Sequence, residues 1–455
     1  MSKRIILLLD GTWNDADIGP TDTNIVRLRD LIAKSLGQQQ TTRVEPAKAT
    51  EAGRKLVHGF ASDGRENIVF YERGVGTSAF DRLRGGIFGE GLGANVRNAY
   101  RFLSYYYEEG DQVFVLGFSR GAYTARSLVG YLNATGLLQR RYCSEQLELK
   151  AWSYYRTSPN ARLPAVWTEL TPYVHWRDKF RVECVAVFDT VGALGVPLEP
   201  FWRANRDRYA FHNVELSSIT NLNLHAIAID EHRKPFQATI WRKPPFKQFS
   251  TTTEQVWFVG SHGDVGGSYI PEEQREAKFP ESLDDISLDW MIKRLLHYYR
   301  DFPVDVKHQW KRLSPSWAQA TQHESRTLPY WIYPKAFRSI ANLPVTGVFP
   351  WQEVCRDRHA HPIAEMVHVS AIERLGQVVW VGRQARKYQP ANLLAVLPEI
   401  MRTYKLGNVD VHAGGTDILL VGWDGRALDP NEDRAVAADL MRAAELRLNS
   451  SAKLN

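Results

Sequence analysis

The chain has 455 residues, 44% of them hydrophobic and 24% charged, a composition that is typical of a folded globular protein and excludes extensive disorder. Its formal net charge is +6, spread without a run of five or six basic residues, so we expect no nucleic-acid partner. Three widely separated cysteines, Cys143, Cys184 and Cys355, lack the spacing of metal ligands and are typical of a protein from a reducing compartment.

The N-terminal stretch "MSKRIILLLDGTWN" contains a run of only five apolar residues. Such a run is too short for the core of a signal peptide and far too short to span a membrane. We therefore expect a cytoplasmic protein, or one that a secretion system exports without a cleaved signal.

Five apolar runs predict strands, and each ends abruptly in Gly, Asp or Ser: "RIILLLDGT", "NIVFYERGVGT", "DQVFVLGFS", "VECVAVFDTVG" and "EQVWFVGSHGDVGG". Continuous apolar runs are typical of strands buried on both faces, as in a parallel sheet covered by helices. Helical patterns lie between them, at residues 93–107, after Ser119 and at residues 282–302. The alternation predicts an α/β fold with a doubly wound, mostly parallel sheet, whose strand ends gather polar groups in one crevice.

The remaining segments carry weaker signals. Residues 41–66 are polar and predict an irregular surface insertion, whereas residues 222–232 predict a helix and its exit. Residues 310–352 are rich in Pro and aromatic residues, which fits either a cap over the crevice or plain packing against the sheet. Near the C-terminus, residues 417–429 predict a short hairpin and residues 431–448 a terminal helix.

The segment Gly117-Phe118-Ser119-Arg120-Gly121 fits the pattern G-x-S-x-G between a predicted strand and a predicted helix. In this context the pattern indicates a nucleophile elbow, a strained turn that exposes a serine hydroxyl at a helix N-terminus. The flanking glycines remove the Cβ atoms that would collide in such a turn. The alternative is an ordinary glycine-rich turn with no chemical role.

A serine needs a base and an acid to become a nucleophile, and hydrolases of this fold supply them in the order Ser, Asp, His. Asp189 and His262 each follow a predicted strand, so Ser119, Asp189 and His262 are the candidate catalytic residues. Asp264 lies too close to His262 in sequence to approach its ring easily, and turn structure explains it better. Seven other histidines are expected to be packing or surface residues, with His368 a minor candidate for the base: His58, His225, His232, His323, His359, His361 and His368.

An oxyanion hole requires two N–H donors, normally one from the residue after the nucleophile and one from an earlier strand loop. Arg120 and either Gly11 or Thr12 fit these positions. Asp10 either takes a direct part in the site or braces its loop. The Arg120 side chain either contacts an anionic group of the substrate or points to solvent or a carboxylate. The glycine-rich segments at residues 74–77 and 85–95 match no phosphate-binding pattern, and we interpret them as mobile walls of the crevice.

Taken together, "LLLDGTWN", "GVGT", "GFSRGAYTAR", "FDTVGALG", "HAIAIDEHR", "WFVGSHGDVGGSY" and "VHVSAIERL…YQPANL" resemble the DUF2235 α/β-hydrolase domain of bacteria and fungi, which includes type VI secretion lipase effectors of the Tle1 group. The resemblance covers about residues 3–394. It implies a serine hydrolase of acyl esters, with phospholipase activity, with Ser119, Asp189 and His262 as its triad and with no metal or other cofactor.

These observations predict a hydrolase domain at residues 1–394, with a cap at 310–352, and a C-terminal extension at 395–455 packed on it. The expected substrate is a phospholipid, reached through transient contact with a membrane surface, and a secretion-system or immunity protein is a candidate partner. Two alternatives stay open: a non-catalytic interaction or delivery protein on a hydrolase scaffold, and an esterase or depolymerase of non-lipid esters.

Overall fold

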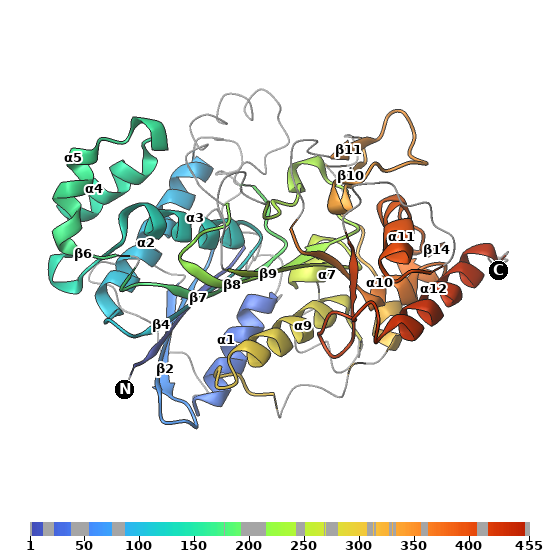
Figure 1. The fold of residues 1–455 in the computed structure, drawn as a ribbon, viewed down its shortest axis with the longest axis horizontal. Coiled ribbons are helices and arrows are strands. Elements are labelled where there is room, and N and C mark those ends of the chain that lie inside the picture. The colour runs from blue at the N-terminus through green and yellow to red at the C-terminus, as the bar shows by residue number, and fades with distance from the viewer. Residues whose placement is uncertain are drawn as a thin grey trace.

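The computed structural model describes residues 2–11, 22–37, 54–74, 87–176, 178–192, 215–242, 251–267, 269, 281–306, 313, 315–326, 330, 334–355, 363–406 and 417–450. Its centre is a nine-stranded sheet in the order β15-β12-β9-β8-β7-β4-β1-β3-β2, shown edge-on among its helices in Figure 1. Every neighbouring pair is parallel except β2 with β3. The predicted α/β class with a mostly parallel sheet is confirmed.

All five predicted strands are present in this sheet. They are β1 (Arg4–Leu9), β3 (Glu66–Glu72), β4 (Gln112–Phe118), β7 (Val182–Phe188) and β9 (Thr252–Phe258). The other four are β2 (Arg54–Phe60), β8 (Thr220–Ala228), β12 (Glu365–His368) and β15 (Leu419–Val421). Three small two-stranded sheets add β5 (Leu137–Leu138) with β6 (Val174–His175), β10 (Ala336–Arg338) with β11 (Glu353–Cys355), and β13 (Val378–Val381) with β14 (Gln384–Lys387).

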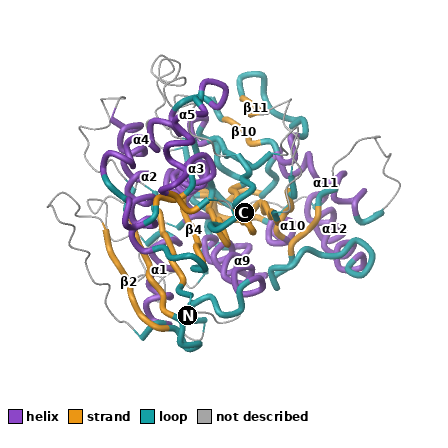
Figure 2. Tube along the Cα trace, turned by 60° about the vertical axis from the view of Figure 1, so that its left-hand side comes forward, coloured by secondary structure: helices purple, strands orange, loops and turns teal. Residues whose placement is uncertain are grey.

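Helices cover both faces of the sheet (Figure 2). Side chains alternate along β1, so that Ile6 and Leu8 enter one core while Ile5, Leu7 and Leu9 enter the other, as the two-residue period of a strand requires. The first core is closed by α1 (Asn24–Ser35), α9 (Leu283–Tyr298), α10 (Val369–Arg374), α11 (Ala391–Thr403) and α12 (Arg434–Asn449). The second is closed by α2 (Ile87–Tyr106), α3 (Ser119–Thr135), α4 (Glu145–Arg156) and α5 (Pro164–Leu170).

The register of the parallel strands brings their carboxyl ends to one edge of the sheet. Leu9 pairs with Gly117, and Phe118 pairs with Phe188. The residues that follow β1, β4 and β7 therefore emerge side by side. One more short helix, α7 (His262–Gly266), begins at the same edge soon after β9.

Some predictions were wrong. Residues 222–232 form β8 and the turn that follows it: all of them are buried, and Leu222, Leu224 and Ala226 enter the first core from a strand that pairs with β7 and β9. Residues 54–60, expected to be irregular, form the antiparallel edge strand β2. Within the predicted hairpin, β15 pairs in parallel with β12 as the other edge of the main sheet, and Val421 also bridges back to Ala427.

The glycine-rich segment from residue 87 onward is the start of α2 rather than a wall of loops, while residues 75–86 lie outside the described part of the chain. The predicted terminal helix is α12. The expected domain boundary at residue 394 falls inside α11, and β15, beyond it, is a strand of the main sheet.

Candidate active site

Ser119 lies at the turn from β4 to α3 and has a φ of 58°, a left-handed conformation that a non-glycine residue adopts only at a cost. A Cβ at Gly117 would lie 2.7 Å from the carbonyl oxygen of Gly121, and a Cβ at Gly121 would collide with the backbone of Leu9 and lie 2.6 Å from the carbonyl oxygen of Asp10. Both glycines are therefore required for β1, β4 and α3 to meet at this turn.

His262, the first residue of α7, contacts both Ser119 and Asp189. Its Nε2 lies 2.8 Å from Ser119 Oγ, and its Nδ1 lies 2.5 Å from Asp189 Oδ2. The imidazole packs against the rings of Phe118 and Phe236, with ring centroids 4.7 and 5.2 Å away. The structure therefore brings the three predicted residues into one hydrogen-bonded chain.

Asp189 follows β7, has a φ of 36° and is completely buried. Burial alone would raise the pKa of its carboxyl group, but the charge of Arg338 and the contact with His262 outweigh burial and hold the pKa well below its ordinary value. Asp189 is therefore ionised, so Nδ1–H of His262 donates to it and Nε2 is left to accept the Ser119 proton.

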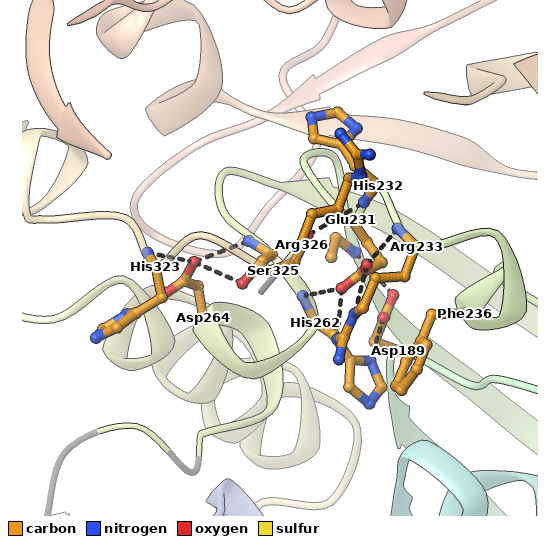
Figure 3. Close-up of polar contacts among 12 residues, drawn as sticks. Asp189, Glu231, His232, Arg233, Phe236, His262, Asp264, His323, Ser325 and Arg326 are labelled. Carbon is orange, nitrogen blue, oxygen red and sulfur yellow. Dashed lines mark hydrogen bonds and ion pairs between the residues drawn. The ribbon is translucent and has the colours of Figure 1, made fainter. Parts of the chain in front are cut away.

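A second carboxylate borders His262. Glu231 Oε2 accepts a hydrogen bond of 3.3 Å from the backbone N–H of His262, and both oxygens of Glu231 bind the Arg233 guanidinium at 2.9 and 2.8 Å. Burial raises the pKa of Glu231, but the Arg233 charge outweighs it and lowers the pKa to about 2. Figure 3 shows this pair and Phe236 around His262.

These surroundings keep the imidazole neutral. Burial lowers the pKa of His262 below 6.5, only partly opposed by Asp189. A neutral imidazole with a buried acid on one nitrogen and a serine hydroxyl on the other can act as a general base.

The candidate oxyanion residues lie around the same turn. Gly11 abuts Ser119, since a Cβ there would lie 3.2 Å from that of Ser119. The Gly11 N–H donates to Asp10 Oδ1 at 2.7 Å, whereas Thr12 lies outside the described residues. Arg120 follows Ser119 in α3, and burial lowers the pKa of its guanidinium to about 10.

Asp10 has a bracing role in the structure. Besides the Gly11 amide, its carboxylate accepts hydrogen bonds from Thr23 Oγ1 at 2.8 Å and from the Tyr71 hydroxyl at 2.9 Å. It thus ties the loop after β1 to the start of α1 and to β3.

The rival histidines have other partners. His225 accepts from the Thr190 amide and His232 contacts the Ala336 carbonyl, both in the interior. His58 pairs with Glu66, and His368 caps α10 through the Ser370 amide. His323 binds Asp264, which also completes a capping box with Ser261 at the start of α7; His359 and His361 lie outside the described residues.

Sequence reasoning missed Arg338 and the Glu231–Arg233 pair. Arg338 lies in the predicted cap segment, 149 residues from the aspartate that it binds. The only sequence feature that could have indicated its role is that it is the one charged residue in the mainly apolar stretch "AFRSIANL". Glu231 and Arg233 were visible only as part of "HAIAIDEHR", with nothing to indicate that they face His262.

In the described part of the chain, no group of three or more His, Cys, Asp or Glu side chains is arranged to hold a metal ion. A search of the same residues finds no helix long and apolar enough to cross a membrane.

Comparison with known proteins places the chain in a family. Residues 3–294 match the model of the catalytic domain of Tle1-like phospholipase effectors of the type VI secretion system. An uncharacterized protein of Saccharomyces cerevisiae, YEL023C, is 29% identical over 260 residues, which are 55% of this chain and 34% of that protein. The chain thus aligns with only about a third of the length of this relative.

Two solved structures are similar at 16% sequence identity. One is an uncharacterized protein from Pseudomonas aeruginosa, with a TM-score of 0.38 and alignment over 70% of this chain and 48% of that one. The other is the Tle1 effector bound to the VgrG spike of the type VI secretion system, with a TM-score of 0.31 and alignment over 59% and 52%. Because the family model matches well over half of the sequence, the chain belongs to the family of Tle1-like phospholipase effectors, through their catalytic domain.

Proposed function

We propose that the protein is a serine hydrolase that cleaves acyl esters of phospholipids through an acyl-enzyme intermediate. The observation that carries this proposal is the continuous chain from Ser119 Oγ through His262 to Asp189, with distances of 2.8 and 2.5 Å. A serine held at a positive φ and bonded to a neutral imidazole has no evident purpose in a purely structural turn.

In this mechanism, His262 Nε2 takes the Ser119 proton as Oγ attacks the ester carbonyl carbon. The ionised carboxylate of Asp189 stabilises the imidazolium that forms. The imidazolium then protonates the departing alcohol oxygen, which leaves the acyl group on Ser119. Water then attacks the acyl carbon while His262 takes its proton. The imidazolium returns that proton to Ser119 Oγ, and the fatty acid is released.

The negative charge on the carbonyl oxygen requires donors beside Ser119. The Arg120 amide, at the N-terminus of α3, is the proposed first donor. Because the Gly11 amide already donates to Asp10, Thr12 is the proposed second donor. The cationic side chain of Arg120 is the proposed contact for an anionic group of the substrate.

Family membership and one surface feature support a lipid substrate at a membrane. Phe349 and Trp351 are 58% and 67% exposed and stack on each other at 4.7 Å. Tryptophan is enriched at membrane–water interfaces, and exposed Trp and Phe side chains are typical of segments that insert at the membrane surface. The family's description as secretion effectors supports a secretion-system partner, and an immunity protein remains a candidate.

The direct test combines a Ser119→Ala variant with a fluorophosphonate probe and a panel of phospholipids and short-chain esters. We expect the wild type to be labelled once per chain, and Ser119→Ala to be unlabelled and at least about a thousandfold slower while keeping the same melting temperature. Hydrolysis by Ser119→Ala at the wild-type rate would refute the assignment. If the folded wild type is not labelled and hydrolyses no ester, an interaction protein is favoured. If it hydrolyses only soluble esters, a non-lipid esterase is favoured.

A further inference from the structure

Arg338, the last residue of β10, binds both oxygens of the Asp189 carboxylate, one of which also contacts His262. The two terminal nitrogens of Arg338 donate to Asp189 Oδ1 at 2.6 Å and to Oδ2 at 2.9 Å. The Arg338 side chain is 2% exposed, so the pair is shielded from water. Such a fork-to-carboxylate contact fixes both the distance and the plane of the acid.

The remaining bonds of this guanidinium reach two other parts of the site. Arg338 also donates to the carbonyl oxygens of Ala228, at the end of β8, and Phe236, at 2.8 and 2.5 Å. The Ala228 amide in turn donates to Asp189 Oδ1 at 2.9 Å, and the Phe236 ring packs against His262. One side chain thus joins the acid, the neighbouring strand and the aromatic wall of the imidazole.

The charges around His262 form two pairs. Asp189 with Arg338 lies at its Nδ1, and Glu231 with Arg233 lies at its backbone N–H. Each carboxylate favours the imidazolium, and each guanidinium opposes it. Loss of the Arg338 charge would leave Asp189 uncompensated and would make protonation of His262 easier.

We propose that Arg338 is a positioning residue for the Ser119–His262–Asp189 chain, which orients the Asp189 carboxylate and offsets its charge so that His262 remains a neutral base. The proposal rests on the proposed function. It also implies that the segment matched to the catalytic family, residues 3–294, does not contain the whole machinery, because β10 at residues 336–338 supplies a part of it.

The test compares Arg338→Gln, which loses both the charge and the paired hydrogen bonds to Asp189, with Arg338→Lys, which keeps the charge but cannot make both bonds. We expect Arg338→Gln to lower kcat on a soluble ester at least about tenfold, with KM changed less than about twofold, and to shift the acid limb of the kcat/KM profile upward by about one pH unit. Arg338→Lys should lose kcat but keep the wild-type limb. Lys335→Gln, which removes a charge from the residue just before β10 and outside the contacts of Asp189, is the control and should match the wild type.

A second measurement does not depend on turnover. The Nδ1 proton of His262 should give a low-field NMR resonance, assigned by its loss in His262→Ala, and its titration midpoint should rise in Arg338→Gln. If the wild type hydrolyses no ester, the proposed function fails but this titration still decides the role of Arg338. An unchanged limb and midpoint in Arg338→Gln would overturn the proposal. If Arg338→Gln does not fold, Arg338→Lys decides. A lower kcat with the acid limb of the kcat/KM profile at its wild-type pH supports the proposed role of Arg338, and a wild-type kcat refutes that role.

Discussion

Two residues of the candidate site, Ser119 and Asp189, have non-glycine backbones at positive φ, 58° and 36°. Such conformations cost about 1–3 kcal/mol each and persist only where the surroundings enforce them. At Ser119 the enforcing contacts are close approaches of β1, β4 and α3 at Gly117 and Gly121. The strain is therefore tied to packing that would not tolerate a side chain at either glycine.

Gly121→Ala should expose this dependence. Its new Cβ would overlap the Leu9 backbone, which no rotamer change can relieve, so we expect the free energy of unfolding to fall by roughly 3 kcal/mol and the fluorophosphonate labelling of Ser119 to slow sharply. Denaturant unfolding and labelling rates measure the two effects. Gly192→Ala is the matched control, since its Cβ would meet nothing within 4 Å; equal losses in both variants would contradict the prediction.

The pH dependence of activity follows from His262. The base must be neutral, and burial lowers its pKa below 6.5, so activity should persist as the pH falls through 6.5 and be lost only at lower pH. The kcat/KM of a soluble ester between pH 4 and 8, corrected for unfolding at each pH, measures this limb. A limb at or above 6.5 would mean that the imidazole is not held neutral in the way its buried contacts indicate.

At the level of elements, sequence patterns predicted the strands that carry the site. The strands before Asp10, Ser119, Asp189 and His262 all end in consecutive buried residues, nearly all of them apolar, because both faces of the sheet are covered there, and that pattern is local. The same locality explains the placing of Ser119 at a turn, since its flanking glycines lie within two residues.

The wrong and missed predictions concern segments whose structure depends on tertiary contacts. The β8 run contains Leu and Ala, which favour a helix in isolation, but its place between β7 and β9 requires an extended chain. The edge strand β15 has only three residues and is defined by its partner β12. Arg338 reaches Asp189 across 149 residues, a pairing that no spacing rule connects.

Strand β12 carries a buried acid that should make stability depend on pH. Glu365 Oε2 accepts from Trp257 Nε1 of β9 and from the Ala341 amide, both at 2.8 Å, whereas Oε1 has no partner among the described residues. Burial raises the Glu365 pKa to about 7 from 4.5. A raised pKa in the folded state stabilises the fold below pH 4.5 and loses that contribution as the pH rises through 7.

Glu365→Gln removes this titration while keeping an acceptor oxygen. The difference in unfolding free energy between the wild type and Glu365→Gln should therefore change by at most about 3 kcal/mol between pH 5 and 8, with the wild type losing stability as pH rises. Urea unfolding at each pH measures it. Glu353→Gln, which alters a partly exposed pair with Lys234, should give a flat difference; a flat difference for Glu365→Gln as well would show that folding does not raise the pKa of Glu365.

At the scale of the whole molecule, the site is assembled by long-range convergence. Its residues come from the ends of β4, β7 and β9 and from β10, and the sheet that aligns them continues to β15 near the C-terminus. The matched catalytic segment ends at residue 294, yet the sheet and the first core extend well beyond it. The later third of the chain is therefore part of the same folded body as the site.

The segment between β10 and β11 connects this body to the proposed membrane surface. Residues 339–352 contain no charged side chain, and the segment projects beyond the two strands in Figure 1. A turn immediately before β11 is closed by hydrogen bonds of 2.9 Å between Phe349 and Gln352, and the stacked rings of Phe349 and Trp351 are exposed there. Because Arg338 is the last residue of β10, the arginine that binds Asp189 and the aromatic turn lie at the two ends of this one segment.

Replacing both aromatic residues of this turn with serine should separate membrane contact from chemistry. Insertion of two half-exposed rings into an interface removes enough apolar area from water to strengthen binding by more than about 1.4 kcal/mol, so Phe349→Ser/Trp351→Ser should weaken vesicle binding at least about tenfold. Vesicle flotation in a Ser119→Ala background measures binding without hydrolysis. Soluble-ester hydrolysis, measured with Ser119 intact, should be unchanged. Trp380→Ser alters a tryptophan that is 56% exposed on β13 and should bind as the parent does; an equal loss there, or full binding by the double variant, would assign the membrane contact to another surface.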